Sequence, residues 1–275
     1  MSNRGSNAVF SGGIQQTDVM KDSFGYEVPV ESVPLPSLGK VYPEGSPLHG
    51  QETVEIRAMT AREEDILTSR ALIKKGTVIT HLIQSCLTNK AIDVKNMISG
   101  DRNALMISLR ITGYGQEYGV EVECPACSTR SKQEFDLAGL EVKTLDIDPV
   151  TPGTNEFEFV LPVTKKKVHF KFLTGADEEE IAIVQERKKK SGFKSDNLVT
   201  TRLMYSIVSI DGITDKSKIN GFIRNMPARD SLALRRFIDQ NEPGIDMKSW
   251  MSCQSCFTDS EVRLPLGATF FWPDA

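Results

Sequence analysis

Alternating apolar and polar residues, followed by apolar residues at helical spacing, organise the first half of the chain. The alternation over 53–59 predicts a strand. Apolar residues three and four positions apart then predict helices that begin at Thr60 and that cover 77–87 and 102–112. A further alternating stretch, 120–123, leads into a Cys-x-x-Cys motif. The first half is therefore predicted to be a small α+β unit that ends in a pair of thiols.

The same order of elements recurs in the second half. Alternation over 168–173 predicts a strand, and helical patterns follow over 181–187, 198–209 and 231–239. A Pro-Gly break at 243–244 precedes the second Cys-x-x-Cys motif. We therefore predict two related halves, and the alternative is a chance similarity between two small α+β stretches.

Two details of the helices support the relation between the halves. The first helix of each half is predicted to begin with a hydroxyl followed three residues later by a carboxylate, Thr60 with Glu63 and Thr174 with Asp177. The acidic residues 63–65 and 177–180 then lie in first helical turns, where they favour the helix dipole. The run Arg102-Asn103-Ala104-Leu105 is aligned with Arg229-Asp230-Ser231-Leu232.

The two cysteine pairs are the strongest candidate for chemistry. Each motif on a turn directs two thiolates at one point, and two turns supply the four sulfurs that zinc binds at about 2.3 Å. The pairs are far apart in sequence, whereas compact ribbons separate theirs by about 15–20 residues. Duplication accounts for the separation, and a disulfide, a redox pair or an iron–sulfur cluster are the alternatives. The predicted ligands are Cys124, Cys127, Cys253 and Cys256.

These patterns predict an α+β fold of two related halves joined at a four-cysteine, zinc-ribbon-like site. The first half covers 33–145 and the second 146–275, with a Pro- and Gly-containing linker over 141–154. Residues 1–32 are rich in Gly, Ser, Asn and Gln and are predicted to form a flexible arm or an arm that orders on a partner.

Composition sets limits on the function. With 39% hydrophobic and 25% charged residues, the 275-residue chain resembles a soluble globular protein. It has no apolar run of the ~20 residues that a membrane helix needs and no secretory signal. The net charge of −4 does not favour a polyanionic partner. Five cysteines, an odd number, favour a reducing compartment, and Cys86 lies in an apolar helical pattern typical of a core residue.

The remaining candidates for chemistry have simpler explanations. His49, His81 and His169 have no local catalytic partner, and no phosphate-binding loop or hydrolase motif is present. We therefore expect no enzymatic activity and no small-molecule substrate. The basic runs 165–167 and 187–190 fit a hairpin turn and a helix C-terminus better than a nucleic-acid site, because no aromatic residues interleave with them.

Three stretches resemble one known family. They are a Leu-Pro-Ser-x-Gly…Tyr-Pro opening at 35–43, the segment 56–67 and the final Phe270-Phe271-Trp272-Pro273, to which the paired cysteines are added. They are similar to the baseplate hub proteins of T-even-like contractile-tailed bacteriophages. The resemblance implies a structural or assembly component of the hub, with other hub and tail proteins as partners. It also implies a place in the virion tail baseplate, and in the host cytoplasm during assembly.

Residues alone leave two further points open. The apolar C-terminus is expected either to pack as a last strand or to anchor a partner, and packing is favoured. The second function that the cysteines permit is a zinc-ribbon regulator that binds nucleic acid, against which the net charge argues.

Overall fold

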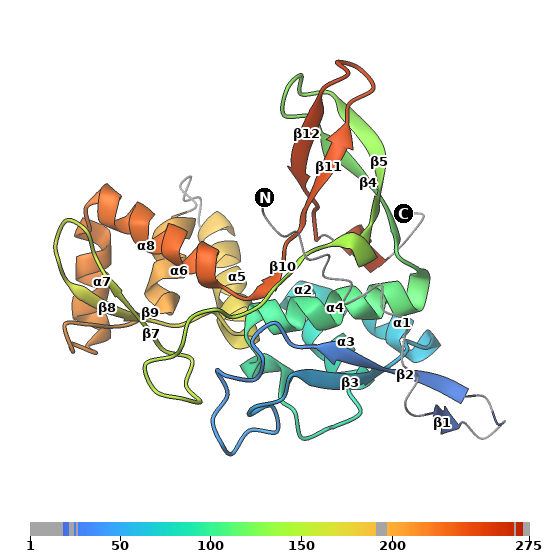
Figure 1. The fold of residues 1–275 in the computed structure, drawn as a ribbon, viewed down its shortest axis with the longest axis horizontal. Coiled ribbons are helices and arrows are strands. Elements are labelled where there is room, and N and C mark those ends of the chain that lie inside the picture. The colour runs from blue at the N-terminus through green and yellow to red at the C-terminus, as the bar shows by residue number, and fades with distance from the viewer. Residues whose placement is uncertain (1–18, 22–24, 26, 191–196, 267, 272–275) are drawn as a thin grey trace, which may run out of the picture.

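Helix α4 (Ser99–Tyr114) lies at the centre of the molecule, between a sheet below it and two hairpins above it (Figure 1). The computed structural model describes residues 19–21, 25, 27–190, 197–266 and 268–271. Residues 104–110 of α4 are all buried. Because the helix is enclosed on every side, it carries Ala, Leu, Met and Ile around its whole circumference rather than along one stripe.

An antiparallel sheet and three helices surround α4 in the first half. Strand β3 alternates between exposed and buried residues, as its sequence predicts, and Val54 and Ile56 face the core. The order β1-β2-β3 follows the chain, and Val33 pairs with Val54. The elements are β1 (Val19–Lys21), β2 (Glu27–Pro34), β3 (Thr53–Arg57), α1 (Ala61–Thr68), α2 (Arg70–Lys75), α3 (Val78–Cys86) and the 3-10 turn η1 (Val94–Asn96).

Part of the predicted N-terminal arm lies in the folded sheet. Residues 1–18, 22–24 and 26 of the arm lie outside the described part of the chain. Strand β2 includes residues 27–32; it pairs with β1 over 27–29 and with β3 over 30–34, and Val30 and Val33 are buried. These residues therefore belong to the folded sheet and not to an arm that ends at 32.

A three-stranded sheet and four helices form the second half. Aromatic rings fill its core, with Phe157 4.7 Å from Phe172 and Phe170 5.9 Å from Phe237 between ring centroids. The sheet has the order β7-β8-β9. The elements are β7 (Phe157–Val160), β8 (Lys167–Phe170), α5 (Gly175–Lys190), α6 (Leu198–Ser206), β9 (Ile207–Ile210), α7 (Lys216–Asn225) and α8 (Ala228–Asn241).

One predicted helix of this half is wrong at its end. The pattern over 198–209 predicts a single helix, but α6 stops at Ser206 and the chain continues as β9. The run Ile207-Val208-Ser209-Ile210 keeps the apolar periodicity, but its branched residues suit a strand, and Ile207 and Ile210 are buried against β8.

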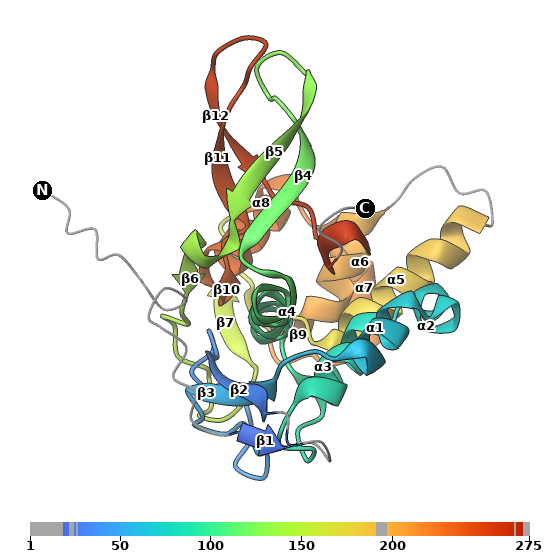
Figure 2. The same cartoon turned by 90° about the vertical axis from the view of Figure 1, so that its right-hand side faces the viewer.

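Two hairpins stand side by side above α4 and project from the body (Figures 1 and 2). A two-stranded pairing of β6 with β10 lies at their base, so the segment predicted as a linker contributes to the join between the halves. The remaining elements are β4 (Glu117–Glu123), β5 (Arg130–Asp136), the 3-10 turn η2 (Leu137–Gly139), β6 (Val142–Lys143), β10 (Gly244–Ile245), β11 (Lys248–Ser252), β12 (Asp259–Arg263) and the 3-10 turn η3 (Ala268–Phe271).

Helices and strands together confirm the α+β class. The same contacts also occur at the first helix of each half. Glu63 accepts from the backbone N–H of Thr60 at 2.9 Å, and Asp177 accepts from the N–H of Thr174 at the same distance. Each carboxylate is also paired with a cation six residues before it, Arg57 or Lys171. The division at residue 145 stays a prediction.

The structure changes the alignment of the later helices. Asp101, in the first turn of α4, accepts from the N–H and hydroxyl of Ser37. Asp230, in the first turn of α8, accepts from the N–H groups of Val163 and Thr164. Asp101 therefore corresponds to Asp230, and the same separation relates Cys124 to Cys253. The alignment of Arg102 with Arg229 is two residues out of register.

Candidate metal centre

All four predicted cysteines meet at the tips of the two hairpins. Cys124 and Cys127 lie in the turn between β4 and β5, and Cys253 and Cys256 lie in the turn between β11 and β12. The Sγ atoms of Cys124 and Cys256 are 3.8 Å apart, and those of Cys127 and Cys253 are 3.7 Å apart. All four sulfurs lie within 4.8 Å of one another.

These distances fit a bound metal ion. Sulfurs arranged tetrahedrally at about 2.3 Å from a central ion are about 3.8 Å from each other. A disulfide needs about 2.05 Å, and the described cysteines are all free thiols. The shorter cross-hairpin distances therefore match the edges of a metal tetrahedron, and the four cysteines could hold one ion.

The two turns that carry the cysteines have the same backbone conformation. The N–H of Cys124 donates to the carbonyl of Thr129 at 2.9 Å, and the N–H of Ser128 donates to the carbonyl of Cys124 at 2.8 Å. The second turn repeats both bonds, and Phe257 donates to Cys253 at 2.9 Å. Ser128 and Phe257 both have positive φ, 58° and 55°, a conformation that glycine adopts most easily.

The surroundings favour the thiolate form of the second cysteine in each turn. Hydrogen bonding with Thr129 lowers the pKa of Cys127 to about 6, which favours its thiolate. Hydrogen bonding with Thr258 likewise lowers the pKa of Cys256. The first cysteines, Cys124 and Cys253, are buried between the hairpins. Ionised sulfurs are the form that binds metal ions.

A buried arginine supports the base of the hairpins. The Arg110 guanidinium is fully enclosed and donates to three backbone carbonyls: Phe270 at 2.8 Å, Gly115 at 2.5 Å and Glu117 at 2.9 Å. Burial lowers the pKa of Arg110. The arginine thereby joins the end of α4, the start of β4 and the C-terminal turn. Sequence reasoning missed this residue, because nothing local distinguishes it from a surface arginine.

The C-terminal segment packs as predicted, but it is not a strand. Residues 268–271 form the turn η3, and Phe270 and Phe271 are buried. The ring of Phe270 lies 5.2 Å from the ring of Tyr118, whose hydroxyl donates to the carbonyl of Pro265 at 2.7 Å. Residues 272–275 lie outside the described part of the chain.

Comparison with known proteins decides the family. The model of the family described as T4 bacteriophage base plate protein matches residues 32–272, which is most of the chain. The chain belongs to this family. It is therefore a phage tail baseplate protein that works with other tail or baseplate proteins. No match was found among curated proteins or among solved structures. Among the residues described, no helix is long and apolar enough to span a bilayer.

The other candidate residues of the baseplate protein are held by local contacts. His49 Nδ1 lies 2.6 Å from the carbonyl of Tyr42, and His169 Nδ1 lies 2.6 Å from Glu156. Cys86 is fully buried, and burial raises its pKa to about 12. His81 lies exposed on α3, which is an ordinary surface position.

The two basic runs lie where their sequences predict. Lys166 pairs with Asp211 at 2.6 Å in the turn between β7 and β8, and Lys190 pairs with Glu186 at 2.7 Å at the end of α5.

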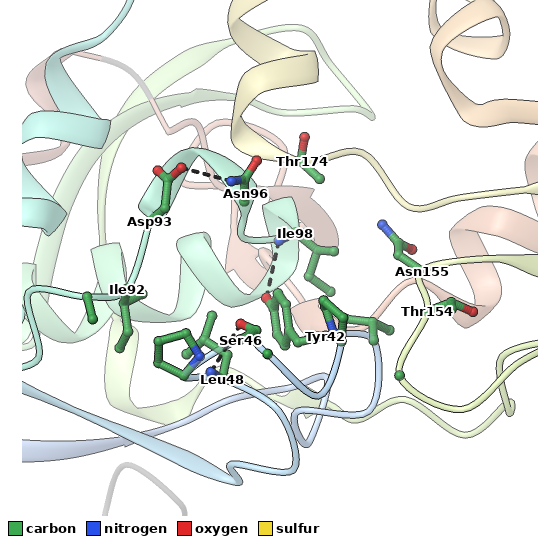
Figure 3. Close-up of a pocket in the computed structure, with 16 residues that line it drawn as sticks. Tyr42, Ser46, Leu48, Ile92, Asp93, Asn96, Ile98, Thr154, Asn155 and Thr174 are labelled. Atoms are coloured by element: carbon green, nitrogen blue, oxygen red, sulfur yellow. Dashed lines mark hydrogen bonds between the residues drawn. The ribbon is translucent and has the colours of Figure 1, made fainter.

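The baseplate protein also has a cavity of about 580 Å³, whose lining includes Val41, Tyr42 and Pro43 at the end of the entry segment 35–43 (Figure 3). Its polar side chains already have partners. Asp93 accepts from the Asn96 amide at 2.8 Å, and the Tyr42 hydroxyl donates to Asp101 at 2.6 Å and accepts from the N–H of Ile98. Proline and aliphatic side chains make up most of the remaining lining, so the cavity holds no paired acid and base.

Proposed function

We propose that this baseplate protein is a non-catalytic structural or assembly component of the central hub, stabilised by one zinc ion on Cys124, Cys127, Cys253 and Cys256. The observation that carries the proposal is the convergence of two distant cysteine pairs at tetrahedral spacing. The bound metal would fix the β4–β5 hairpin against the β11–β12 hairpin and would thereby join the first half of the chain to the second.

The ligand set supports zinc in a structural role. Four thiolates select zinc or an iron–sulfur cluster over harder cations. Four sulfurs less than 5 Å apart fit around a single zinc ion better than around an iron–sulfur cluster of several atoms. Four protein ligands close the coordination sphere, so no position remains for water or substrate. A site of this kind contributes to folding and does not act as a Lewis acid.

The hub assignment rests on the resemblance to hub proteins of 35–43, 56–67 and 270–273 and on their order along the chain. In the first of these stretches, the hydroxyls of Ser37 and Tyr42 both donate to the buried carboxylate of Asp101. The nucleic-acid alternative has less support. Lysines of both basic runs are engaged with carboxylates, as Lys166 and Lys190 show.

Metal analysis tests the zinc. Purified protein examined by elemental mass spectrometry should contain about one zinc per chain, and Cys253→Ser should lose it together with much of its thermal stability. Cys86→Ala is the matched control, because it removes a buried thiol outside the site and should keep the metal. Protein without metal, or protein that contains iron and sulfide, would contradict the proposed zinc.

Localisation tests the hub. Baseplates purified from phage that carry a peptide tag on this protein can be labelled with gold and imaged. Gold on the central axis is the expected result. Gold at the periphery, or the complete absence of the protein from baseplates and their assembly intermediates, would refute a hub role.

A further inference from the structure

Two large aromatic side chains are exposed on the second hairpin. Phe257, in the cysteine turn, is 88% exposed, and Trp250, on β11, is 70% exposed. Other large apolar side chains on the described surface are about half exposed at most. Exposed tryptophan and phenylalanine are costly in water, and aromatic residues are enriched where one protein binds another.

The first hairpin shows that the metal site does not need these aromatics. In the alignment that relates Cys124 to Cys253, Trp250 corresponds to Glu121, and Phe257 corresponds to Ser128. Both hairpins have the same backbone turn, so a glutamate and a serine suffice for this architecture. The two aromatic side chains are therefore not needed for the turn or for the cysteine site, and they are particular to the second hairpin.

Backbone conformation makes Phe257 still less favourable. Its φ of 55° lies in the left-handed region, which bulky side chains avoid and which costs a non-glycine residue roughly 1–2 kcal/mol. The side chain of Phe257 is not buried, so packing does not offset this cost. Because Ser128 has the same φ in the first turn, the conformation belongs to the turn, and only the aromatic side chain is particular to position 257.

Charged residues surround the two exposed aromatic side chains on the hairpins. Trp250 lies opposite Glu261 in the β11–β12 register, and Glu261 is paired with Lys248 at 3.2 Å. Taken together, the two hairpins carry more acidic than basic residues, and the excess lies on the first hairpin, beside the one that carries the aromatic residues. The acidic residues are Glu117, Glu121, Glu123, Glu134, Asp136, Asp259 and Glu261, and the basic ones are Arg130, Lys132, Lys248 and Arg263. Four thiolates around the proposed divalent ion would add further negative charge.

We infer that Phe257 and Trp250 anchor this protein to another protein of the tail, in an apolar pocket whose rim is basic. The baseplate role supplies only the class of partner. Nucleic acid would be repelled by the acidic hairpins.

The chain supplies its own matched substitutions. Phe257→Ser and Trp250→Glu install the residues that the first hairpin carries at the same positions, so the turn and the metal site should be retained. We expect the double variant to keep its metal and its melting temperature. Its incorporation into baseplates, measured by mass spectrometry of purified particles, should fall at least about tenfold. Serine already occupies the same conformation at position 128, so loss of folding is not expected.

Photo-crosslinking identifies what lies against the surface. A benzophenone amino acid replaces Phe257 during assembly in host cells, and the same substitution at Ser128 is the control. We expect a cross-link from position 257 to a different tail protein, at a peptide that contains apolar residues beside lysine or arginine, and no such product from position 128. A product with a second copy of this chain, with nucleic acid or with no protein would overturn the inference.

The surface and the hub proposal fail separately. If the wild-type protein is found in the hub and the double variant is incorporated to the same extent, the binding surface is refuted and the hub proposal stands. If the wild-type protein is found at the periphery of the baseplate and the double variant is not incorporated, the hub proposal is refuted and the binding surface is supported.

Discussion

Replacement of Glu63 by glutamine tests how much one buried ion pair contributes to the fold. The Glu63 side chain has no exposed surface, and its two oxygens accept from Arg57 at 2.7 and 3.0 Å. They also accept from the N–H and hydroxyl of Thr60 and from the hydroxyl of Ser85. A glutamine amide keeps only one of the two acceptor oxygens. At least two donors therefore lose their acceptor in either orientation, one of them on the arginine.

The expected loss is large for a single substitution. A buried donor without an acceptor costs about 1–3 kcal/mol, and breaking a buried ion pair costs about 3–5 kcal/mol. We expect Glu63→Gln to lower the free energy of unfolding by about 3–5 kcal/mol, measured by urea denaturation at pH 7 with circular dichroism. Asp177→Asn is the control. Its pair with Lys171 is partly exposed, so its loss should be about 1 kcal/mol.

The pH dependence gives a second test of the same pair. Burial raises the pKa of Glu63, but hydrogen bonds from Arg57, Ser85 and Thr60 outweigh it and hold the pKa well below its usual range. Stability from a carboxylate with a lowered pKa is present above the unfolded value of about 4.3 and is lost as pH falls through the folded pKa. The gap between wild type and variant should therefore narrow below about pH 4. A loss no greater than that of Asp177→Asn, or a gap that does not change with pH, would refute the reasoning.

Three further substitutions have defined outcomes. Gly100→Ala should destabilise by about 1–3 kcal/mol in chemical denaturation, because a methyl group there would overlap the carbonyl of Pro243; unchanged stability would mean that α4 can shift. Arg110→Met should cost about 3 kcal/mol and speed hydrogen exchange at Phe270, whereas exchange limited to α4 would contradict its role at the C-terminal turn. Burial raises the pKa of Glu242 to about 7, so wild-type stability should fall as pH rises from about 4.5 to 7. Glu242→Gln should remove this slope in melting temperatures recorded from pH 5 to 8, and parallel profiles would show that the carboxyl is not responsible.

Local patterns predicted the parts of the structure that depend on neighbours in sequence. The strand over 53–59, the helix that begins after Thr60 and the helix over 77–87 occur within a few residues of their expected bounds. Their alternation, caps and turn signals act over a few residues. The four-cysteine cluster was predicted across the whole chain because repetition of the motif supplied the missing long-range information.

Features set by contacts distant in sequence were not predictable. Arg110 donates to a carbonyl 160 residues away, and no local pattern indicates such a partner. The alignment at Arg102 followed matching arginines, whereas the corresponding contacts belong to Asp101 and Asp230, whose donors lie more than 60 residues from them. Helix α7 was not predicted, and β9 continued the apolar periodicity of the preceding helix.

The distance in sequence between the cysteine pairs orders events during synthesis. Cys127 and Cys253 are 126 positions apart, so a ribosome that adds about 5–20 residues per second needs on the order of ten seconds to pass from one to the other. During that time the first hairpin carries two thiols without their counterparts. A chain that terminates early can never complete the set, so an assembled four-cysteine cluster reports that translation has reached the last hairpin. Recognition of the finished hairpin pair would thereby restrict entry into the baseplate to chains long enough to include the second hairpin.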